Sequence, residues 1–340
     1  MLKHLIIKTS SLGDIVHMLP AITDAHRKIP DISFDWVAES GFIEIPSWHP
    51  DIDQVIEIGL RKWRKQLFNR ETWAAFSAFK RKLKAHPYEK AIDSQGLIKS
   101  ALVARMSQGE TWGYDKNSIR DSSASYLYQN KVAVSYKEHA VTRNRLILAK
   151  SLGYTIDDLD LDYGIADNPV FKQACSELAK HSVFQGNGIP DKSIIALHGT
   201  SRTNKEWPIE HWNGFIEEMQ AVGYSVLFPW GNDEELARAE KFAQNHTQHS
   251  AKAIALPRCS LTTLAGLIQN ASAVIGMDTG LLHVAAAFDQ KGVALYPATE
   301  PKRSGAMSPS SLIESIGGEA SLDAAAINAK MLALLSKASS

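Results

Sequence analysis

Short apolar runs alternate with longer segments of helical periodicity along most of this chain. The strands predicted in the first half are Leu5–Lys8, Phe34–Ala38, Gln54–Ile58 and Lys90–Asp93. Those predicted in the second half are Ile194–His198, Ser225–Pro229, Ala253–Leu256, Ala273–Met277 and Gly292–Tyr296. Between most of them, apolar residues recur at helical spacing, as in Ile15–Lys28, His211–Val222 and Leu261–Gln269. Such alternation is typical of parallel sheets that carry helices on both faces.

The alternation occurs twice, which predicts an α/β protein with two doubly wound, Rossmann-like domains. A length of 340 residues fits two domains of ordinary size. An acidic stretch from Asp157 to Asn168 fits neither pattern and ends at Pro169, so we place the linker there. The predicted domains are residues 1–160 and 161–320. A final helix over 321–340 follows, for which packing back toward the N-terminal domain is one option.

The composition of the chain excludes some classes of function and of cellular location. The 37 basic residues balance the 37 acidic ones, so no global basic field indicates a nucleic-acid partner. Two cysteines, Cys175 and Cys259, do not make a disulfide framework and favour a reducing compartment. We find no leader peptide and no apolar run long enough to span a bilayer, and so expect a cytoplasmic protein that could still touch a membrane surface.

Ligands of doubly wound sheets bind at the carboxyl ends of the strands, so two facing domains would form a central cleft. The first strand ends in the polar turn "KTSSLGD", from Lys8 to Asp14. Asp14 lies at the start of a helix, where an acid satisfies free backbone N–H groups. A carboxylate at a strand end could equally act as a general base, with Gly13 permitting close backbone approach. Position alone leaves both interpretations open.

Polar residues also follow the strands of the second half. The segment "HGTSRTNKEWP" offers the hydroxyls of Thr200 and Ser201 and the charge of Lys205, which together suit a phosphate group. A solvated loop is the alternative. Glu235 could accept hydrogen bonds from a sugar, although position alone favours an ordinary acid at the start of a helix.

A further strand-to-helix turn contains Asp278, Thr279 and Gly280, with His283 in the helix that follows. The N–H groups at the start of that helix could receive a diphosphate. His283 by itself is more often a core or capping residue. The chain has no G-x-G-x-x-G after its first strand and no P-loop, which weakens ordinary dinucleotide or P-loop chemistry. The histidine spacing predicts no metal site.

One stretch of the first half, "LRKWRKQLFNR", concentrates basic residues, among them Arg61, Arg64 and Lys65. It is either a solvated helical face or a local site for an anionic, partly apolar partner. Gln95 follows another predicted strand in "DSQGLIK", and Arg120 lies in a polar loop of the same half.

In order and spacing, seven segments resemble the type I family of lipopolysaccharide heptosyltransferases. They are "KTSSLGDIVHMLPA", "FDWVAE", "RKWRK", "DSQGLIKSALVAR", "HGTSRTNKEWP", "PWG" and "DTGLLHVAAA". The likeness spans nearly the whole chain and is weakest after about Pro301. It implies the GT-B fold, in which two Rossmann-like domains face a central cleft. It also implies transfer of L-glycero-D-manno-heptose from ADP-heptose to the first Kdo of Kdo2-lipid A, with inversion and without a metal or other cofactor.

The resemblance also implies roles for single residues. Asp14 falls on the catalytic base, and Lys205 falls on a catalytic and donor-binding position. The other donor positions are Thr200, Ser201, Glu235, Cys259, Asp278, Thr279, Gly280 and His283. The acceptor positions are Ser10, Gly13, Arg61, Arg64, Lys65, Gln95 and Arg120.

For location, the resemblance implies a peripheral protein at the anionic cytoplasmic face of the inner membrane of a Gram-negative cell. Other functions stay open. One is a heptosyltransferase of type II or III, or an enzyme for a related ADP- or UDP-sugar. Another is a sugar-nucleotide or lipid A binding protein without transfer activity. An oxidoreductase or epimerase on a Rossmann scaffold would need the dinucleotide fingerprint that the sequence lacks.

Overall fold

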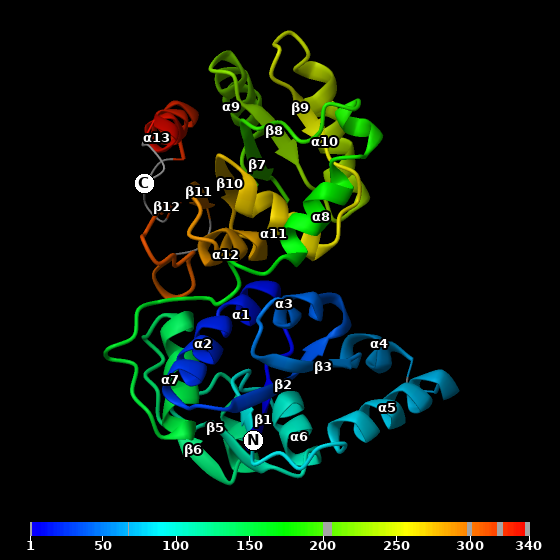
Figure 1. Ribbon diagram of the computed structural model, residues 1–340, viewed down its shortest axis with the longest axis vertical. Helices are drawn as coiled ribbons and strands as arrows, with labels where there is room; N and C mark the ends of the chain where they lie inside the picture. The colour runs from blue at the N-terminus through cyan, green and yellow to red at the C-terminus, as the bar shows by residue number, and fades with distance from the viewer. Residues whose placement is uncertain (1, 67, 200–205, 298–300, 318–321, 337–340) are drawn as a thin grey trace. The chain divides into compact units, whose positions relative to one another are not determined.

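The computed structural model describes residues 2–66, 68–199, 206–297, 301–317 and 322–336. The chain divides into two compact units, Met1–Ile165 and Ala166–Ser340 (Figure 1). Each unit holds one six-stranded parallel sheet with helices on its faces, which confirms the predicted α/β class.

The first sheet has the strand order β3-β2-β1-β4-β5-β6. Its strands are β1 (Leu2–Ile7), β2 (Ile32–Glu39), β3 (Ile52–Ile58), β4 (Lys90–Asp93), β5 (Glu110–Tyr114) and β6 (Asn130–Val132). Its helices are α1 (Leu12–Val16), α2 (Leu19–Lys28), α3 (Glu44–Ser47), α4 (Leu60–Lys65), α5 (Arg70–Leu83), α6 (Ile98–Met106) and α7 (Ala140–Leu152). Single turns of 3-10 helix lie at η1 (Ser40–Phe42) and η2 (Ser122–Leu127).

Strand β1 lies at the centre of this sheet and is covered on both faces. Its Leu5 and Ile7 point to one face and belong to a core cluster with Phe79 of α5 and Val103 of α6. Alternation along a strand sends Ile6 to the opposite face, where it is also fully buried. Burial on both faces explains the continuous apolar run Leu5–Ile7 at the end of this strand.

The predicted helix Ile15–Lys28 is two helices, because the chain breaks at His17 and Met18. Pro20 occupies the first turn of α2. Proline lacks the N–H that a continuous helix would need there, and it suits the start of a new helix. Strands β5 and β6 were not predicted.

The second sheet has the order β12-β11-β10-β7-β8-β9. Its strands are β7 (Ser193–Leu197), β8 (Ser225–Phe228), β9 (Ala253–Ala255), β10 (Ala273–Met277), β11 (Gly292–Tyr296) and β12 (Ile313–Gly317). Its helices are α8 (Val170–Leu178), α9 (Ile209–Ala221), α10 (Asp233–Asn245), α11 (Leu261–Asn270), α12 (Gly280–Ala287) and α13 (Ala324–Ser336), with 3-10 turns η3 (Ser182–Phe184) and η5 (Pro301–Arg303).

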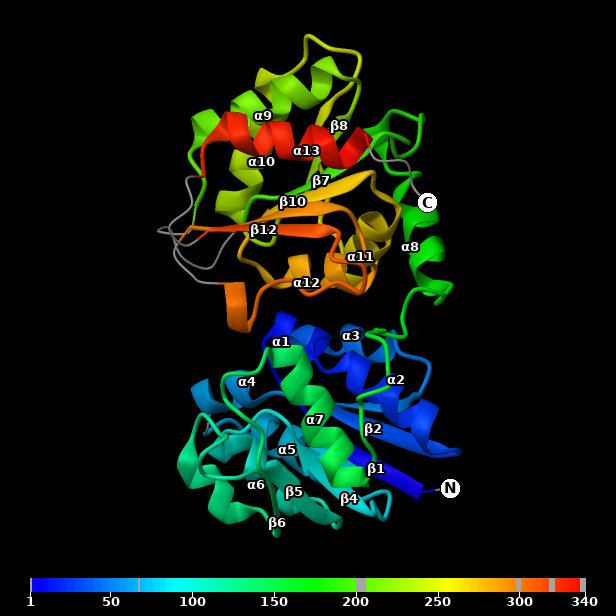
Figure 2. The same ribbon diagram turned by 90° about the vertical axis from the view of Figure 1, so that its left-hand side faces the viewer.

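Helix α13 confirms the predicted final helix, but its apolar side packs within its own unit. Ile327, Met331 and Leu334 are buried in the core cluster of the second sheet, and α13 lies beside α9 (Figure 2). These contacts place α13 on the second sheet. Among the described helices, none combines the length and the hydrophobicity that crossing a membrane requires.

Candidate active site

Asp14 lies in the first turn of α1, immediately beyond the carboxyl end of β1. Its Oδ2 accepts hydrogen bonds from the Ser11 backbone N–H at 2.8 Å and from Ser11 Oγ at 3.3 Å. Ser11 and Asp14 thus form a capping box, which satisfies free N–H groups at the helix start. The structural interpretation of Asp14 is confirmed, and its role as a base stays a prediction. The neighbouring Gly13 is an ordinary helical residue whose carbonyl accepts from the His17 N–H.

The turn that carries Asp14 is fastened to the next strand end by Gln95. The side-chain oxygen of Gln95 accepts from the backbone N–H groups of Thr9 at 3.0 Å and Ser10 at 3.1 Å. The structure therefore brings Ser10 and Gln95 together, and their role in binding an acceptor stays a prediction. However, the side-chain oxygen of Gln95 already accepts these two backbone hydrogen bonds. This role was missed, because 85 residues separate Gln95 from Ser10 in the chain.

Gln95 is itself held by a buried carboxylate. Asp93 Oδ1 accepts from the N–H groups of Gln95 at 2.8 Å and Gly96 at 3.2 Å, and its Oδ2 accepts from Tyr128 Oη at 2.6 Å. Burial raises the pKa of Asp93, and the Tyr128 hydrogen bond opposes that rise. Gly96 has φ +69°, a backbone conformation that favours glycine. A chain of bonds thus runs from Tyr128 through Asp93 and Gln95 to the Asp14 turn.

Lys8 makes a second contact between the opening turn and the end of β4, although the sequence assigned it no role. Lys8 is buried, and its Nζ donates to the Ser94 carbonyl oxygen at 2.9 Å. Burial lowers the pKa of Lys8, while the charges of Asp14 and Asp93 raise it. A buried lysine therefore contributes a favourable electrostatic interaction to the carboxylate of Asp14.

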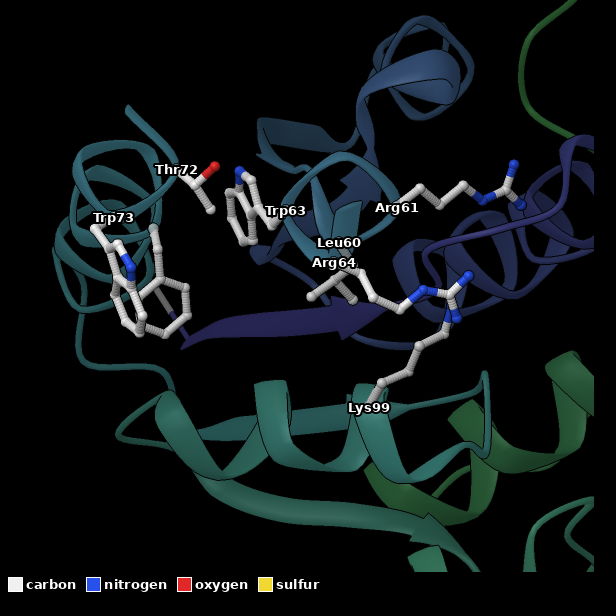
Figure 3. Close-up of a pocket in the computed structure, with 8 residues that line it drawn as sticks. Leu60, Arg61, Trp63, Arg64, Thr72, Trp73 and Lys99 are labelled. Atoms are coloured by element: carbon white, nitrogen blue, oxygen red, sulfur yellow. The ribbon is translucent and has the colours of Figure 1, made fainter. Parts of the chain in front are cut away.

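The basic residues predicted to meet the acceptor fall into two groups. Arg61 and Arg64 of α4 line a cavity of about 580 Å³, together with Lys99 of α6 (Figure 3). Lys65 and Arg120 are exposed and do not line this cavity. The structure thus gathers two of the four predicted cations and adds Lys99, which the sequence shows only as one lysine in a helix.

Glu39 at the end of β2 is a second residue that sequence reasoning missed. Its side chain is buried, and burial raises its pKa, while the nearby charges of Arg61 and Lys99 lower it. The Arg61 backbone N–H also donates to this carboxylate. The only signal in the sequence is an acid that closes the run "FDWVAE".

In the second unit, the predicted phosphate residues Thr200, Ser201 and Lys205 lie outside the described residues. The residue before them, Gly199, is in close contact with Glu235. A Cβ on Gly199 would lie 2.4 Å from Glu235 Oε1, so a larger residue there would force this carboxylate to move.

Glu235 lies in the first turn of α10, where it completes the helix start. Its Oε2 accepts from the Gly231 N–H at 2.7 Å, and its own N–H donates to Asn232 Oδ1 at 2.9 Å. This confirms the interpretation as a helix-start acid. The contact with Gly199 also places the carboxylate beside the loop that leaves β7.

The turn predicted to bind a diphosphate follows β10. Thr279 is the N-cap of α12 and Gly280 is the first helical residue, while the Thr279 side chain makes no capping bond. Asp278 lies between strand and helix, and His283 is buried one turn into α12. Strand β7 pairs with both β8 and β10, so the polar residues after these strands share one edge of the sheet.

Cys259 is half-buried, and its Sγ donates to the Pro257 carbonyl oxygen at 3.2 Å. Burial raises the pKa of Cys259 to about 11, so the thiol is neutral near pH 7 and can offer only a weak contact. Over the part of the chain that the structure describes, no cluster of three or more His, Cys, Asp or Glu residues could hold a metal ion.

Comparison with known proteins gives a consistent result. Residues 76–328 match the model of glycosyltransferase family 9 (heptosyltransferase). Lipopolysaccharide heptosyltransferase 1 of Salmonella typhimurium is 40% identical over 298 residues, covering 87% of this chain and 89% of that protein. The enzyme of the same name from Pseudomonas aeruginosa is 39% identical, covering 89% and 80%. The solved structure of E. coli heptosyltransferase WaaC with ADP has a TM-score of 0.87 at 35% identity, covering 98% of this chain and 100% of that one.

Proposed function

The chain belongs to glycosyltransferase family 9, the heptosyltransferases, and on that premise we propose a specific reaction for it. The protein moves L-glycero-D-manno-heptose from ADP-heptose to the first Kdo of Kdo2-lipid A, a step in assembly of the lipopolysaccharide inner core. The transfer proceeds with inversion and needs no metal ion. The chain is a glycosyltransferase with two six-stranded parallel sheets of the GT-B type.

The observation that carries this proposal is the Asp14 turn. A half-buried carboxylate stands at the carboxyl end of the central strand of its sheet, and a second strand end holds its turn through Gln95. A capping acid needs no such support from outside its own helix. A general base does need it, because proton transfer requires a fixed position relative to the substrate hydroxyl.

Asp14 would take the proton from the attacking hydroxyl of the Kdo sugar. The hydroxyl oxygen forms a bond to the anomeric carbon of heptose as the bond from that carbon to the diphosphate breaks. The electron pair of the broken bond leaves with ADP. One displacement at one carbon inverts its configuration.

The second unit would hold the donor. The start of α12 offers backbone N–H groups that the Thr279 side chain does not cap, and these suit the diphosphate. Lys205 would add the cation that stabilises charge on departing ADP, which removes the need for a divalent metal. Glu235, beside the loop after β7, would accept from the ribose hydroxyls. Asp278 and His283 would meet the diphosphate and the heptose, and Cys259 would border the adenine.

The first unit would hold the acceptor. Kdo2-lipid A carries carboxylates and phosphates, and Arg61, Arg64, Lys65 and Arg120 are exposed cations on a chain of zero net charge. Attraction to an anionic membrane face must therefore be local, at about 1 kcal/mol for each basic residue near the surface. We place the protein at the cytoplasmic face of the inner membrane, without insertion.

The test is to incubate the protein with ADP-heptose and Kdo2-lipid A, with and without a chelator. We expect release of ADP and a mass increase of one heptose on the acceptor, both unchanged by the chelator. Transfer only to an acceptor that already carries heptose would indicate a type II or III enzyme. ADP-heptose binding without transfer to either acceptor would refute the proposed reaction and indicate a sugar-nucleotide binding protein.

A further inference from the structure

The loop over residues 115–121 leaves β5 and carries Arg120, one of the exposed cations that we assign to the acceptor. The two residues before Arg120, Ser118 and Ile119, are buried. Ser118 Oγ accepts a hydrogen bond from the Val134 N–H at 2.8 Å. An exposed cation therefore follows directly on two residues that are fixed in the interior of the first unit.

Ile119 packs on the turn that follows β4. A Cβ added to Gly96 would lie 2.8 Å from Cγ1 of Ile119, so these two residues are in close contact. Gly96 follows Gln95, whose side-chain oxygen accepts from two backbone N–H groups of the turn that carries Asp14. The loop that carries Arg120 and the turn that carries Asp14 thus both contact the same strand end.

Arg143 of α7 joins this loop to the segment before its own helix. Its Nη2 donates to the Ser118 carbonyl oxygen at 2.5 Å. Its Nη1 donates to the carbonyl oxygens of Val134 at 3.1 Å and Ser135 at 2.7 Å. One side chain thus supplies donors to three carbonyl groups, which belong to two different loops, one after β5 and one after β6.

Two aromatic rings fix the plane of this guanidinium. Its Cζ lies 4.7 Å from the ring centroid of Tyr114 and 4.9 Å from that of Tyr136. Arg143 forms no ion pair within 4.0 Å with any carboxylate among the residues that the structure describes. A lysine could not replace it, because only the guanidinium offers several donors in a fixed planar fork that also stacks on rings.

We propose that Arg143 is a positioning residue for the acceptor, which joins the loop over 115–121 to the segment before α7 and so holds Arg120 in place for an anionic group of the substrate. The inference rests on the proposed function, because it takes Arg120 as an acceptor residue. It deepens that function by naming a residue that acts without touching the substrate. Direct binding of a substrate anion is not the role we assign to Arg143, because both of its Nη atoms already donate to backbone carbonyls.

The first test is a double-mutant cycle on transfer from ADP-heptose to Kdo2-lipid A. Arg143→Met removes all three hydrogen bonds and should raise the Michaelis constant for Kdo2-lipid A about tenfold, while that for ADP-heptose stays within about twofold. In an Arg120→Ala background, Arg143→Met should change the acceptor constant by no more than about twofold, because its effect passes through Arg120.

Two further variants separate the role of geometry from that of charge. Arg143→Lys keeps the positive charge but cannot reach both loops with one planar fork, so it should be impaired as strongly as Arg143→Met. Lys150→Ala is the matched control, because Lys150 also lies on α7 and donates to one backbone carbonyl, that of Ala133, at 2.8 Å. It should leave both Michaelis constants within about twofold of the native values.

A second measurement, hydrogen exchange followed by mass spectrometry, does not depend on turnover. The Ser118 N–H donates to Asp115 Oδ1 at 2.9 Å, so its exchange reports directly on the order of the loop. In Arg143→Met and Arg143→Lys, residues 116–121 should exchange at least about tenfold faster than in the native protein, with exchange in β4 unchanged.

Unchanged exchange in residues 116–121, or a near-native acceptor constant in Arg143→Lys, would overturn the proposal. So would effects that multiply when Arg143→Met and Arg120→Ala are combined, since Arg143 would then act on the acceptor or on the fold by itself. Each of these results, with transfer by the native protein intact, refutes this inference alone. Absence of transfer by the native protein refutes the proposed function, and the acceptor role of Arg143 with it.

Discussion

The double role of Asp14 can be separated by two substitutions at the same position. Asp14→Asn keeps a side-chain oxygen that can accept from the Ser11 N–H, a bond that is 2.8 Å long in the native protein. It removes the negative charge and the basicity. Asp14→Ala removes the acceptor as well.

The structure sets the size of each effect. Loss of the charge at the start of a helix costs about 0.3–1 kcal/mol. Loss of the capping acceptor adds about 1 kcal/mol. Asp14→Ala should therefore lower the melting temperature of the N-terminal unit by a few degrees, at about 2–4 °C for each kcal/mol, and Asp14→Asn by less. Loss of a general base costs about 10²–10⁴-fold in rate, and this loss should be the same in both variants.

The assay is release of ADP from ADP-heptose in the presence of acceptor, with thermal unfolding measured on the same samples. Ser11→Ala is the matched control. It removes the hydroxyl of the capping box and leaves the carboxylate in place, so it should destabilise the protein by about 1 kcal/mol and change the rate only a few-fold. Near-normal turnover in Asp14→Asn would refute the assignment. So would a Ser11→Ala variant that is as slow as Asp14→Asn, since the rate would then follow helix capping and not basicity.

Three further predictions follow from the described contacts. Gln95→Ala leaves the Thr9 and Ser10 N–H groups without their acceptor, so kcat should fall at least tenfold while the ADP affinity measured by calorimetry stays unchanged. Gln95→Glu keeps an acceptor oxygen and should restore most of the rate. Equal losses of rate in both variants would contradict a positioning role for Gln95. Burial lowers the pKa of His49 to about 4, so the ring stays neutral in the folded protein, whereas an unfolded chain protonates it near pH 6.5. The stability contributed by the neutral ring is therefore present above pH 6.5 and falls by up to about 3 kcal/mol as pH drops toward 4. In denaturant unfolding, His49→Gln should lose less stability across that pH range than the native protein does. Replacing Arg61, Arg64 and Lys65 by Ala should raise the Michaelis constant for the acceptor and leave donor affinity unchanged. Added salt should raise the same constant for the native protein, because salt screens these charges. A fall in donor affinity alone would mean that these residues serve the nucleotide site or the stability of the fold.

The sequence alone determined the elements that are buried on both sides. Strands Lys90–Asp93, Ala273–Met277 and Gly292–Tyr296 were predicted with the bounds that the structure shows. Continuous apolar runs, as in Ala273–Met277 and Gly292–Tyr296, report local burial directly, so no knowledge of distant residues is needed to find them. The alternation of such runs with helices was enough to predict two parallel sheets.

Other elements depend on their neighbours. Strands β6 and β12 lie at the edges of their sheets, and β5 contains a charged residue and a glycine. Their own residues do not stand out, and pairing with an adjacent strand makes them strands. Likewise, the division of the first predicted helix at Met18 reflects a turn between α1 and α2 that apolar periodicity does not record.

The candidate residues divide in the same way. The turn around Asp14 and the helix start at Gly280 could be found in the sequence, because a strand end followed by a helix is a local pattern. Whether Gln95 faces a substrate or holds the backbone of Thr9 and Ser10 is a matter of contact between strands far apart in the chain.

The cavity that Arg61, Arg64 and Lys99 line exists only because side chains of α4, α5 and α6 meet there. Trp73 and Lys99 also line this cavity, but they lie in two separate helices, and nothing in the sequence indicates that they come together. Sequence sets which side chains are available and which local backbone carries them. Only tertiary packing brings distant ones within a few ångströms, and the free energies of hydrogen bonding, burial and charge act at that range.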